Sequence, residues 1–524
     1  MQDNPSSSVP PAAAPRPHRY SHHNIQVEDP YAWLRDPAYP KVEDPEILAY
    51  LSAENAYFDA YMSPLQPLVE ELFEEIKGRQ PAEDECVPYQ KHGYRYQWRF
   101  AKDAQYRTWY RSSLEKPDAW QVILDEVALA KGHEYFSLGA LAVSPCGGKM
   151  AYSIDTTGDE RYTLAVIDID NGAALSAPIT DTIGSPIWDA ASESFLYVVV
   201  NEQWQPLQVY RHLLGAGPDR LIYAEEDTGF RVSTDLSQSE QFVFINSGSH
   251  TTNEVWLLPR DNLLAEPVLM RPRSSDIEYH VDHGNGEFII RSNLRQSNFD
   301  LYRTADTHPH ADHWVPYVQG SERKYLTGHM VLHRRVIVEE RLDGLDQIRV
   351  IEGGGESHHI EFPEAAYDVS IGNNPEFHTN ILRLSYTSMV TPQTVYDYDL
   401  THRALATRKV REIPSGYDAS RFVTQRLQAP ARDGAQVPIS IVYHRDTPLD
   451  GGAPLYLYGY GAYGLGMSPS FSPARISLLD RGFVFAIAHI RGGDELGYHW
   501  YTQGKLAART NTFNDFVACA EYLV

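Results

Sequence analysis

A strand-like segment, a polar loop and a second strand-like segment recur seven times along the middle of this 524-residue chain. The recurrences start 44 to 58 residues apart, and a unit that repeats at about this interval is typical of a four-stranded propeller blade. We therefore predict a seven-bladed β-propeller over residues 78–414, with ordinary hairpins of a β-sandwich as the alternative. The first strands of the seven pairs begin near Tyr94, Tyr152, Leu196, Phe242, Phe288, Val336 and Leu382.

The residues before the propeller divide into two parts. Residues 1–20 are rich in Pro, Ala and Ser and predict a flexible leader, because they lack both the basic start and the apolar core of a signal peptide. Residues 21–77 predict a helical segment, with helices at about Pro45–Met62 and Leu65–Lys77, where apolar side chains recur on one side.

After about residue 415 the pattern changes to that of an α/β domain. A hairpin is expected to turn at Asp433-Gly434, because Asp-Gly between two apolar runs favours a tight turn. Residues 454–461 and 482–490 predict two short buried strands of a parallel sheet, since both are apolar and bounded by glycines. Residues 511–524 predict a helix with one apolar side, which contains Phe513, Phe516, Val517 and Ala520.

The last residue, Val524, lies inside this apolar helix, with no glycine cap or polar tail after it. A domain of residues 415–524 alone would leave a sheet edge and its faces uncovered. We therefore expect the sequence to be a fragment or a natural truncation that holds only the N-terminal part of the α/β domain.

Composition excludes several classes of function. The formal net charge of −25 argues against nucleic acid as a partner, because phosphate binding requires a basic face. No apolar run is long enough to span a membrane, so neither nucleic acid nor a membrane is expected as a partner. Three widely spaced cysteines indicate a reducing compartment, and we expect a cytoplasmic protein.

The candidate chemistry lies in the stretch YGYGAYG, which follows a predicted strand. A Gly-x-Ser-x-Gly motif, which would expose a nucleophilic serine, is not present in the sequence. Tyr460 nevertheless occupies the place of an oxyanion loop, where a protonated phenol can donate a hydrogen bond to a developing oxyanion. Gly459 and Gly461 let this loop bend close to a substrate, although a surface turn remains the alternative.

Several motifs together resemble the prolyl oligopeptidase family of serine peptidases, and within it most closely the oligopeptidase B branch. The resemblance covers residues 20–524. The matching stretches are DPYAWLRD (29–36), YGYGAYG (458–464), SLLDRG (477–482), HIRGGDELG (489–497) and NTFNDF (511–516).

The resemblance implies a seven-bladed propeller joined to an α/β-hydrolase domain, with the N-terminal helices packing on the latter. It implies a serine oligopeptidase that cleaves short peptides after Arg or Lys and needs no metal or organic cofactor. The sequence does not determine the oligomeric state, and we expect a monomer. Tyr460 matches the oxyanion-hole tyrosine of the family, and Tyr463 matches an aromatic residue that borders the substrate pocket. The catalytic Ser, Asp and His of the family would fall beyond Val524, so the chain alone is expected to be inactive.

This sequence departs from the family pattern at two places. Ser468 and Ser470 stand where the oligopeptidase B branch carries acids that hold a basic P2 residue, which weakens the expectation of a dibasic preference. Asp494 replaces a glycine, and the sequence suggests no role for it. The alternatives are a prolyl-specific oligopeptidase, or a non-catalytic propeller binding protein that retains part of a hydrolase.

Three further residues or clusters invite a functional interpretation. His308, His310 and His313 have the spacing of metal ligands, but a proline and the lack of nearby carboxylates favour a solvated loop. His489 could act as a base, but the family pattern makes it structural. Arg491 is expected to form a buried ion pair that shapes the loop after its strand.

Overall fold

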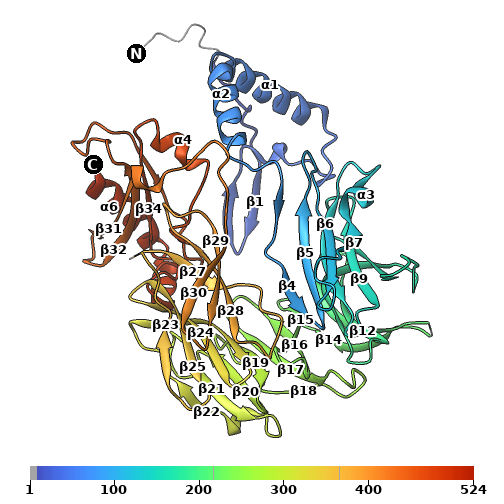
Figure 1. The fold of residues 1–524 in the computed structure, drawn as a ribbon. Coiled ribbons are helices and arrows are strands. Elements are labelled where there is room, and N and C mark those ends of the chain that lie inside the picture. Colours follow the sequence, from blue (N-terminus) through green and yellow to red (C-terminus); the bar gives the residue numbers. More distant parts are fainter. Residues whose placement is uncertain (1–8, 216, 365) are drawn as a thin grey trace. The chain divides into compact units, whose positions relative to one another are not determined.

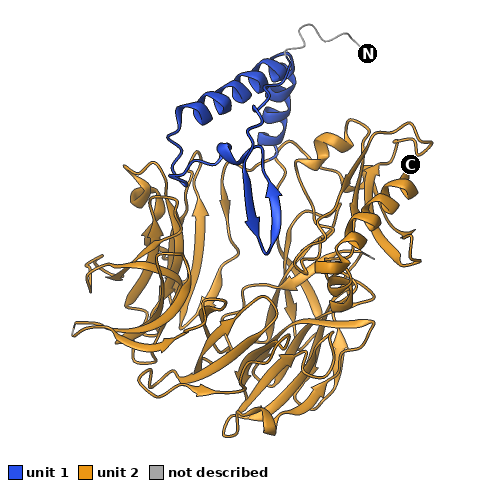
Figure 2. Ribbon diagram, turned by 180° about the vertical axis from the view of Figure 1, so that it is seen from behind, with its two compact units in different colours: residues 1–79 blue, residues 80–524 orange. Residues whose placement is uncertain are grey.

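The structure is a computed structural model, and it describes residues 9–215, 217–364 and 366–524. Two compact units are distinguished, Met1–Arg79 and Gln80–Val524, and Figure 2 colours them separately. Among the described residues, no helix combines the length and the apolar character that a membrane crossing requires.

The first unit contains a hairpin and two helices. Strands β1 (Arg19–His22) and β2 (Ile25–Glu28) pair antiparallel, and a 3-10 turn follows at Ala32–Leu34. Helix α1 (Pro45–Met62) has the predicted bounds, because Asp44 caps its first turn and Pro45 suits its first position. A 3-10 turn (Ser63–Leu65) follows, so α2 (Gln66–Lys77) begins one residue later than predicted.

The second unit begins with the propeller, whose sheets follow one another along the chain from blue to orange in Figure 1. The first blade contains β3 (Asp84–Glu85), β4 (Tyr89–Lys91), β5 (Tyr94–Phe100), β6 (Thr108–Ser113) and β7 (Gln121–Asp125), and is followed by the short helix α3 (Glu126–Ala130). The next sheet contains β8 (Ser137–Val143), β9 (Lys149–Asp155), β10 (Tyr162–Asp168), β11 (Ile179–Trp188), β12 (Ser194–Val200), β13 (Pro206–Leu213) and β14 (Arg220–Ala224).

This seven-stranded sheet comprises two blades joined by one long strand. Strand β11 pairs with β10 near its start and with β12 as far as Trp188, and its register shifts between Ile183 and Ile187. An irregularity of this kind bends a strand. The single strand β11 therefore serves as the last strand of the second blade and the first strand of the third.

The four remaining blades are regular four-stranded antiparallel sheets. The fourth blade contains β15 (Arg231–Leu236), β16 (Phe242–Gly248), β17 (Asn253–Pro259) and β18 (Val268–Leu269). The fifth contains β19 (Tyr279–Gly284), β20 (Glu287–Ser292), β21 (Asp300–Ala305) and β22 (Val315–Val318). The sixth contains β23 (Lys324–Leu332), β24 (Arg335–Leu342), β25 (Leu345–Glu352) and β26 (Ser357–His359). The seventh contains β27 (Asp368–Ile371), β28 (Ile381–Thr387), β29 (Thr394–Asp399) and β30 (Ala404–Val410).

The seven-bladed propeller is therefore confirmed, and the seven pairs predicted from the sequence are the two middle strands of the blades. Middle strands are paired on both sides and packed on both faces, so they carry long apolar runs. The outermost strands are shorter or more exposed. Strand β18 has only two residues, and most residues of β30 are exposed.

A loop of the seventh blade, residues 372–380, reaches the turns of other blades. The carbonyl oxygens of Asn374 and Phe377 and the carboxylate of Glu376 each accept a hydrogen bond from such a turn. The donors are the Gln238 amide at 2.6 Å, the His333 backbone N–H at 3.0 Å and the His92 backbone N–H at 3.1 Å, respectively. Because these donors belong to the fourth, sixth and first blades, the loop links turns at one end of the propeller.

The chain ends with part of an α/β domain. Its sheet has the order β31 (Phe422–Pro430), β32 (Gln436–His444), β34 (Val484–Ala488) and β33 (Leu455–Tyr458). The predicted hairpin turn is confirmed between β31 and β32, where Gly434 has a φ of +89°. Strands β33 and β34 are parallel, as predicted. Helices α4 (Arg475–Leu479), α5 (Tyr498–Thr502) and α6 (Thr510–Leu523) complete it.

Two expectations about this domain are wrong in detail. Strand β33 is not fully buried, because it lies at the edge of the described sheet and exposes Tyr456 and Tyr458. Helix α6 does not bury the predicted side, since Phe513 and Val517 are exposed. It buries instead the side that contains Thr512, Asp515, Ala518 and Cys519.

Candidate active site

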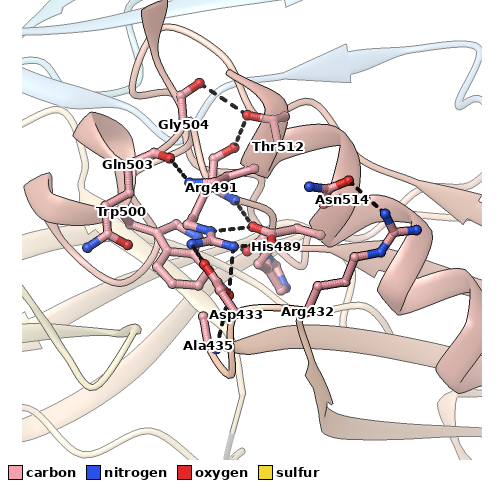
Figure 3. A network of polar contacts seen from close by, with 12 residues as sticks. Arg432, Asp433, Ala435, His489, Arg491, Trp500, Gln503, Gly504, Thr512 and Asn514 are labelled. Atoms are coloured by element: carbon pink, nitrogen blue, oxygen red, sulfur yellow. Dashed lines mark hydrogen bonds and ion pairs between the residues drawn. The ribbon is translucent and has the colours of Figure 1, made fainter. Parts of the chain in front are cut away.

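The loop after β34 is fastened by the guanidinium of Arg491, as Figure 3 shows. Its Nε and Nη2 donate to the two carboxylate oxygens of Asp515 at 2.8 and 2.6 Å, and Nη1 donates to Asp433 at 2.6 Å. The Asp515 side chain is fully buried, and its hydrogen bonds to Arg491 raise the pKa of the guanidinium. The expected buried ion pair is confirmed, and it ties the β31–β32 turn and α6 to one loop.

Two glycines allow this loop to touch the loop that contains Tyr460. Gly492 has a φ of +101°, and a Cβ there would lie 2.1 Å from the carbonyl oxygen of Gly461. Gly461 has a φ of +59°, and a Cβ there would meet Ile490 at 2.6 Å and Thr512 at 2.7 Å. Both positions have a backbone conformation that favours glycine, and neither leaves room for a Cβ atom. Any larger residue at either position would therefore push the two loops apart.

Hydrogen bonds hold the same two loops together. The backbone N–H of Gly464 donates to the carbonyl oxygen of Gly492 at 2.9 Å. The guanidinium of Arg509 donates to the carbonyl oxygen of Gly461. The hydroxyl of Thr512 donates to the carbonyl oxygen of Arg491 at 2.7 Å (Figure 3). The backbone around Tyr460 is thus fixed from both sides.

The Tyr460 side chain itself extends into open space. It is 40% exposed, and its hydroxyl has no hydrogen-bond partner in the part of the chain that the structure describes. Its neighbour Tyr463 is 67% exposed and has a φ of +56°, which is uncommon for a residue with a side chain. A fixed backbone that carries a free phenol is suited to donate a hydrogen bond to a ligand.

Tyr463 lies against the propeller. Its ring meets His250 edge-on, with ring centroids 5.9 Å apart, and His250 comes from the loop between β16 and β17. The His250 Nε2 is 2.9 Å from the hydroxyl of Tyr501 on α5. Sequence reasoning missed His250 and Tyr501, because nothing near either residue in the chain marks this contact.

A second contact between propeller and α/β domain explains Asp494. Arg341 of β24 donates to the Asp494 carboxylate at 2.8 Å and to Asp346 at 2.9 Å. Burial by itself would lower the pKa of Arg341. The attraction of the Asp494 and Asp346 carboxylates has the larger effect, so the pKa of Arg341 is raised. A Cβ at Gly466 would lie 2.5 Å from the Asp494 carboxylate. Asp494 therefore braces the segment that follows Tyr463.

His489 lies in the interior of the sheet, as expected. Its Nε2 is 2.7 Å from the hydroxyl of Ser440, and its Nδ1 is 3.6 Å from the carboxylate of Glu495. Glu495 also accepts a hydrogen bond from the backbone N–H of Met467 at 2.9 Å. These residues resemble a catalytic triad, but they line a cavity of only about 40 Å³. Such a space can hold water and not a peptide.

The remaining candidates from the sequence are two serines and three histidines. Ser468 and Ser470 lie on the loop before α4, and Ser470 donates its N–H to the Ser468 carbonyl at 2.8 Å. The carboxylate of the buried Glu495 accepts a hydrogen bond from the backbone N–H of Met467, the residue before this stretch, at 2.9 Å. The histidines of the predicted solvated loop, His308, His310 and His313, are exposed.

Comparison with known proteins agrees with this architecture. Residues 10–411 match the family described as prolyl oligopeptidase, N-terminal beta-propeller domain, and residues 469–524 match the prolyl oligopeptidase family. The chain therefore belongs to the prolyl oligopeptidase family, and the resemblance noted in the sequence is confirmed.

Individual relatives place the chain near oligopeptidase B. It is 36% identical to dipeptidyl aminopeptidase BI of Pseudoxanthomonas mexicana, over 99% of this chain and 74% of that protein. It is 33% identical to Protease 2 of Moraxella lacunata, over 98% and 75%. The structure of oligopeptidase B from Leishmania major superposes with a TM-score of 0.91 at 30% identity, over 99% of this chain and 77% of that one.

Proposed function

We propose that these residues form the oxyanion-binding part of a serine oligopeptidase that hydrolyses short peptides after Arg or Lys. The nucleophilic serine and its Asp and His lie outside these 524 residues in this proposal. The serine attacks the peptide carbonyl, the scissile C–N bond breaks and the amine half of the substrate leaves, which gives an acyl-enzyme. Water then hydrolyses the ester, which releases the acid and the free serine. The 524 residues by themselves are therefore inactive.

One observation carries the proposal, namely the free phenol of Tyr460 on a rigid backbone. A donor that is already fixed needs no reorganisation when negative charge develops on the substrate oxygen. The Arg491 ion pair and the contact between Gly461 and Gly492 supply that rigidity. Tyr463, which faces His250, borders the substrate pocket from the propeller side.

We further propose the division of the chain into a leader (1–20), a helical segment (21–77), a propeller (78–414) and part of a hydrolase domain (415–524). The protein acts as a monomer in the cytoplasm on short peptides. No metal or organic cofactor takes part in the proposed reaction.

The test compares Tyr460→Phe with Tyr458→Phe in the full-length product of the gene that encodes this chain. The substrates are fluorogenic peptides with Arg or Pro before the scissile bond, each with a free or a blocked N-terminus. We expect cleavage after Arg and a loss of about 10²-fold in kcat for Tyr460→Phe, because one oxyanion donor is removed. Tyr458 is similarly exposed, and its variant should retain full activity.

The outcomes separate the alternatives. Equal kcat for the two variants contradicts the role of Tyr460 and leaves the peptidase activity standing. Cleavage after Pro instead of Arg supports a prolyl-specific enzyme. If only substrates with a free N-terminus are cleaved, the result supports a dipeptidyl aminopeptidase, as the Pseudoxanthomonas relative is named. No hydrolysis by any product of the gene supports a non-catalytic binding protein.

A further inference from the structure

A cavity of about 920 Å³ lies between the fifth and sixth blades of the propeller, lined also by residues of the 372–380 loop. Its volume falls in the range of small-molecule sites. None of its lining residues belongs to the α/β domain, so it is separate from the candidate active site. Its floor consists of buried aliphatic side chains from one packed cluster, Ile289, Val331, Val336 and Ile351.

Guanidinium groups stand at the rim of this floor. Arg335 is neutralised by Glu352 at 2.9 Å and also donates to the side chain of Asn380 at 3.2 Å. Arg303 and Arg334 are exposed, and neither has a carboxylate partner within residues 9–215, 217–364 and 366–524. Two unpaired arginines at one cavity are unexpected in a protein whose net charge is −25.

A neighbouring histidine pair responds to this positive charge. The rings of His333 and His378 lie 4.6 Å apart between centroids. The pKa of His333 is lowered by desolvation, then by His378 and the adjacent arginines, which disfavour a further positive charge. Besides Glu352, one carboxylate, Glu287, lines the cavity among the described residues. The cations therefore exceed the anions around this space.

Arg303 offers an aromatic surface together with its charge. Its guanidinium carbon lies 5.4 Å from the centroid of the Tyr317 ring, which also lines the cavity. A guanidinium held over a ring keeps its hydrogen-bond donors available in a defined plane. A ligand could thus place an anionic group on the rim and an apolar body on the aliphatic floor.

We propose that this cavity binds an organic oxyanion, a carboxylate or a phosphate ester, whose charge pairs with Arg303 and Arg334 and whose apolar body covers the aliphatic floor. Guanidinium groups bind both anions through paired hydrogen bonds, so the shared chemistry is that of a planar or tetrahedral oxyanion. The site is independent of the proposed peptidase reaction.

Isothermal titration calorimetry of the full-length product of the gene that encodes this chain tests the proposal with three probes. Phenyl phosphate and N-acetylphenylalanine carry the two anions, and N-acetylphenylalanine amide is the neutral control. We expect saturable binding of at least one anion and at least about 10-fold weaker binding of the amide, because it lacks the charge-assisted pair. The anion that binds more tightly identifies the natural class.

The test variant combines Arg303→Gln and Arg334→Gln in one protein. The control variant carries Arg220→Gln alone. Arg220 is exposed on β14, away from the cavity. We expect about 10-fold or greater loss of anion affinity in the double variant and no loss in the control. The single variant Arg334→Gln serves if the double variant does not fold. The proposal is wrong if neither anion binds, or if the amide binds as tightly as the anions. It is also wrong if the arginine variants bind the anions as tightly as the wild-type protein.

Discussion

Replacing Arg491 by methionine tests whether the buried ion pair fixes the loop that supports Tyr460. The Asp515 carboxylate has no exposed surface, whereas the Asp433 side chain is 49% exposed. Removing the guanidinium therefore leaves one charge buried without its partner, which typically costs about 3–5 kcal/mol. The backbone N–H of Arg491 still donates to Asp515 at 3.1 Å, so we expect a loss near the lower limit, about 3 kcal/mol.

Native-state hydrogen exchange on β34 and residues 489–492 measures this loss locally, which suits a chain of several parts. A loss of about 3 kcal/mol lowers the protection of these amides about 10²-fold. Asp433→Ala is the matched control, and its exposed carboxylate should cost about 1 kcal/mol or less. The double variant Arg491→Met with Asp515→Leu removes both charges and should recover most of the loss.

Two results would refute this reasoning. If Asp433→Ala lowers protection as much as Arg491→Met, the solvent-exposed pair and not the buried one holds the loop. If the double variant is no better protected than Arg491→Met alone, the loss comes from packing and not from an uncompensated charge.

Two further predictions concern one residue of the α/β part and one of the propeller. Gly492→Ala should lower the free energy of unfolding of the α/β part by about 2–4 kcal/mol, since a methyl group would overlap the Gly461 carbonyl; a urea midpoint equal to that of wild type would contradict this. His329 has its pKa lowered to about 4 by burial and by Arg291. The unfolded chain then binds more protons between pH 6.5 and 4, so stability falls as pH falls through this window. Because the ring is partly exposed, we expect His329→Gln to remove about 1–2 kcal/mol of that acid loss, as measured by urea denaturation at pH 7 and pH 4.5; parallel losses in both proteins would contradict it.

The Tyr460 loop shows which features the sequence predicts and which depend on tertiary contacts. Gly459 and Gly461 predicted a loop that can bend, but not that this loop touches Gly492 of the loop after β34. That contact depends on the parallel pairing of β33 and β34, which brings the ends of both strands to one edge of the sheet. Helix α6 shows the limit of periodicity, because it buries Asp515 in an ion pair with Arg491 and exposes Phe513.

The sequence by itself determined the seven blades, the Asp433-Gly434 hairpin, the parallel pair of strands at its end and the family, because strand patterns and turn residues act between near neighbours in the chain. Only the tertiary structure decided that His250 meets Tyr463, that Arg341 pairs with Asp494, and that two arginines of different blades line one cavity with no carboxylate partner among the described residues. These contacts join residues far apart in sequence. Their geometry follows from how the blades and the sheet pack, which no local pattern of residues records.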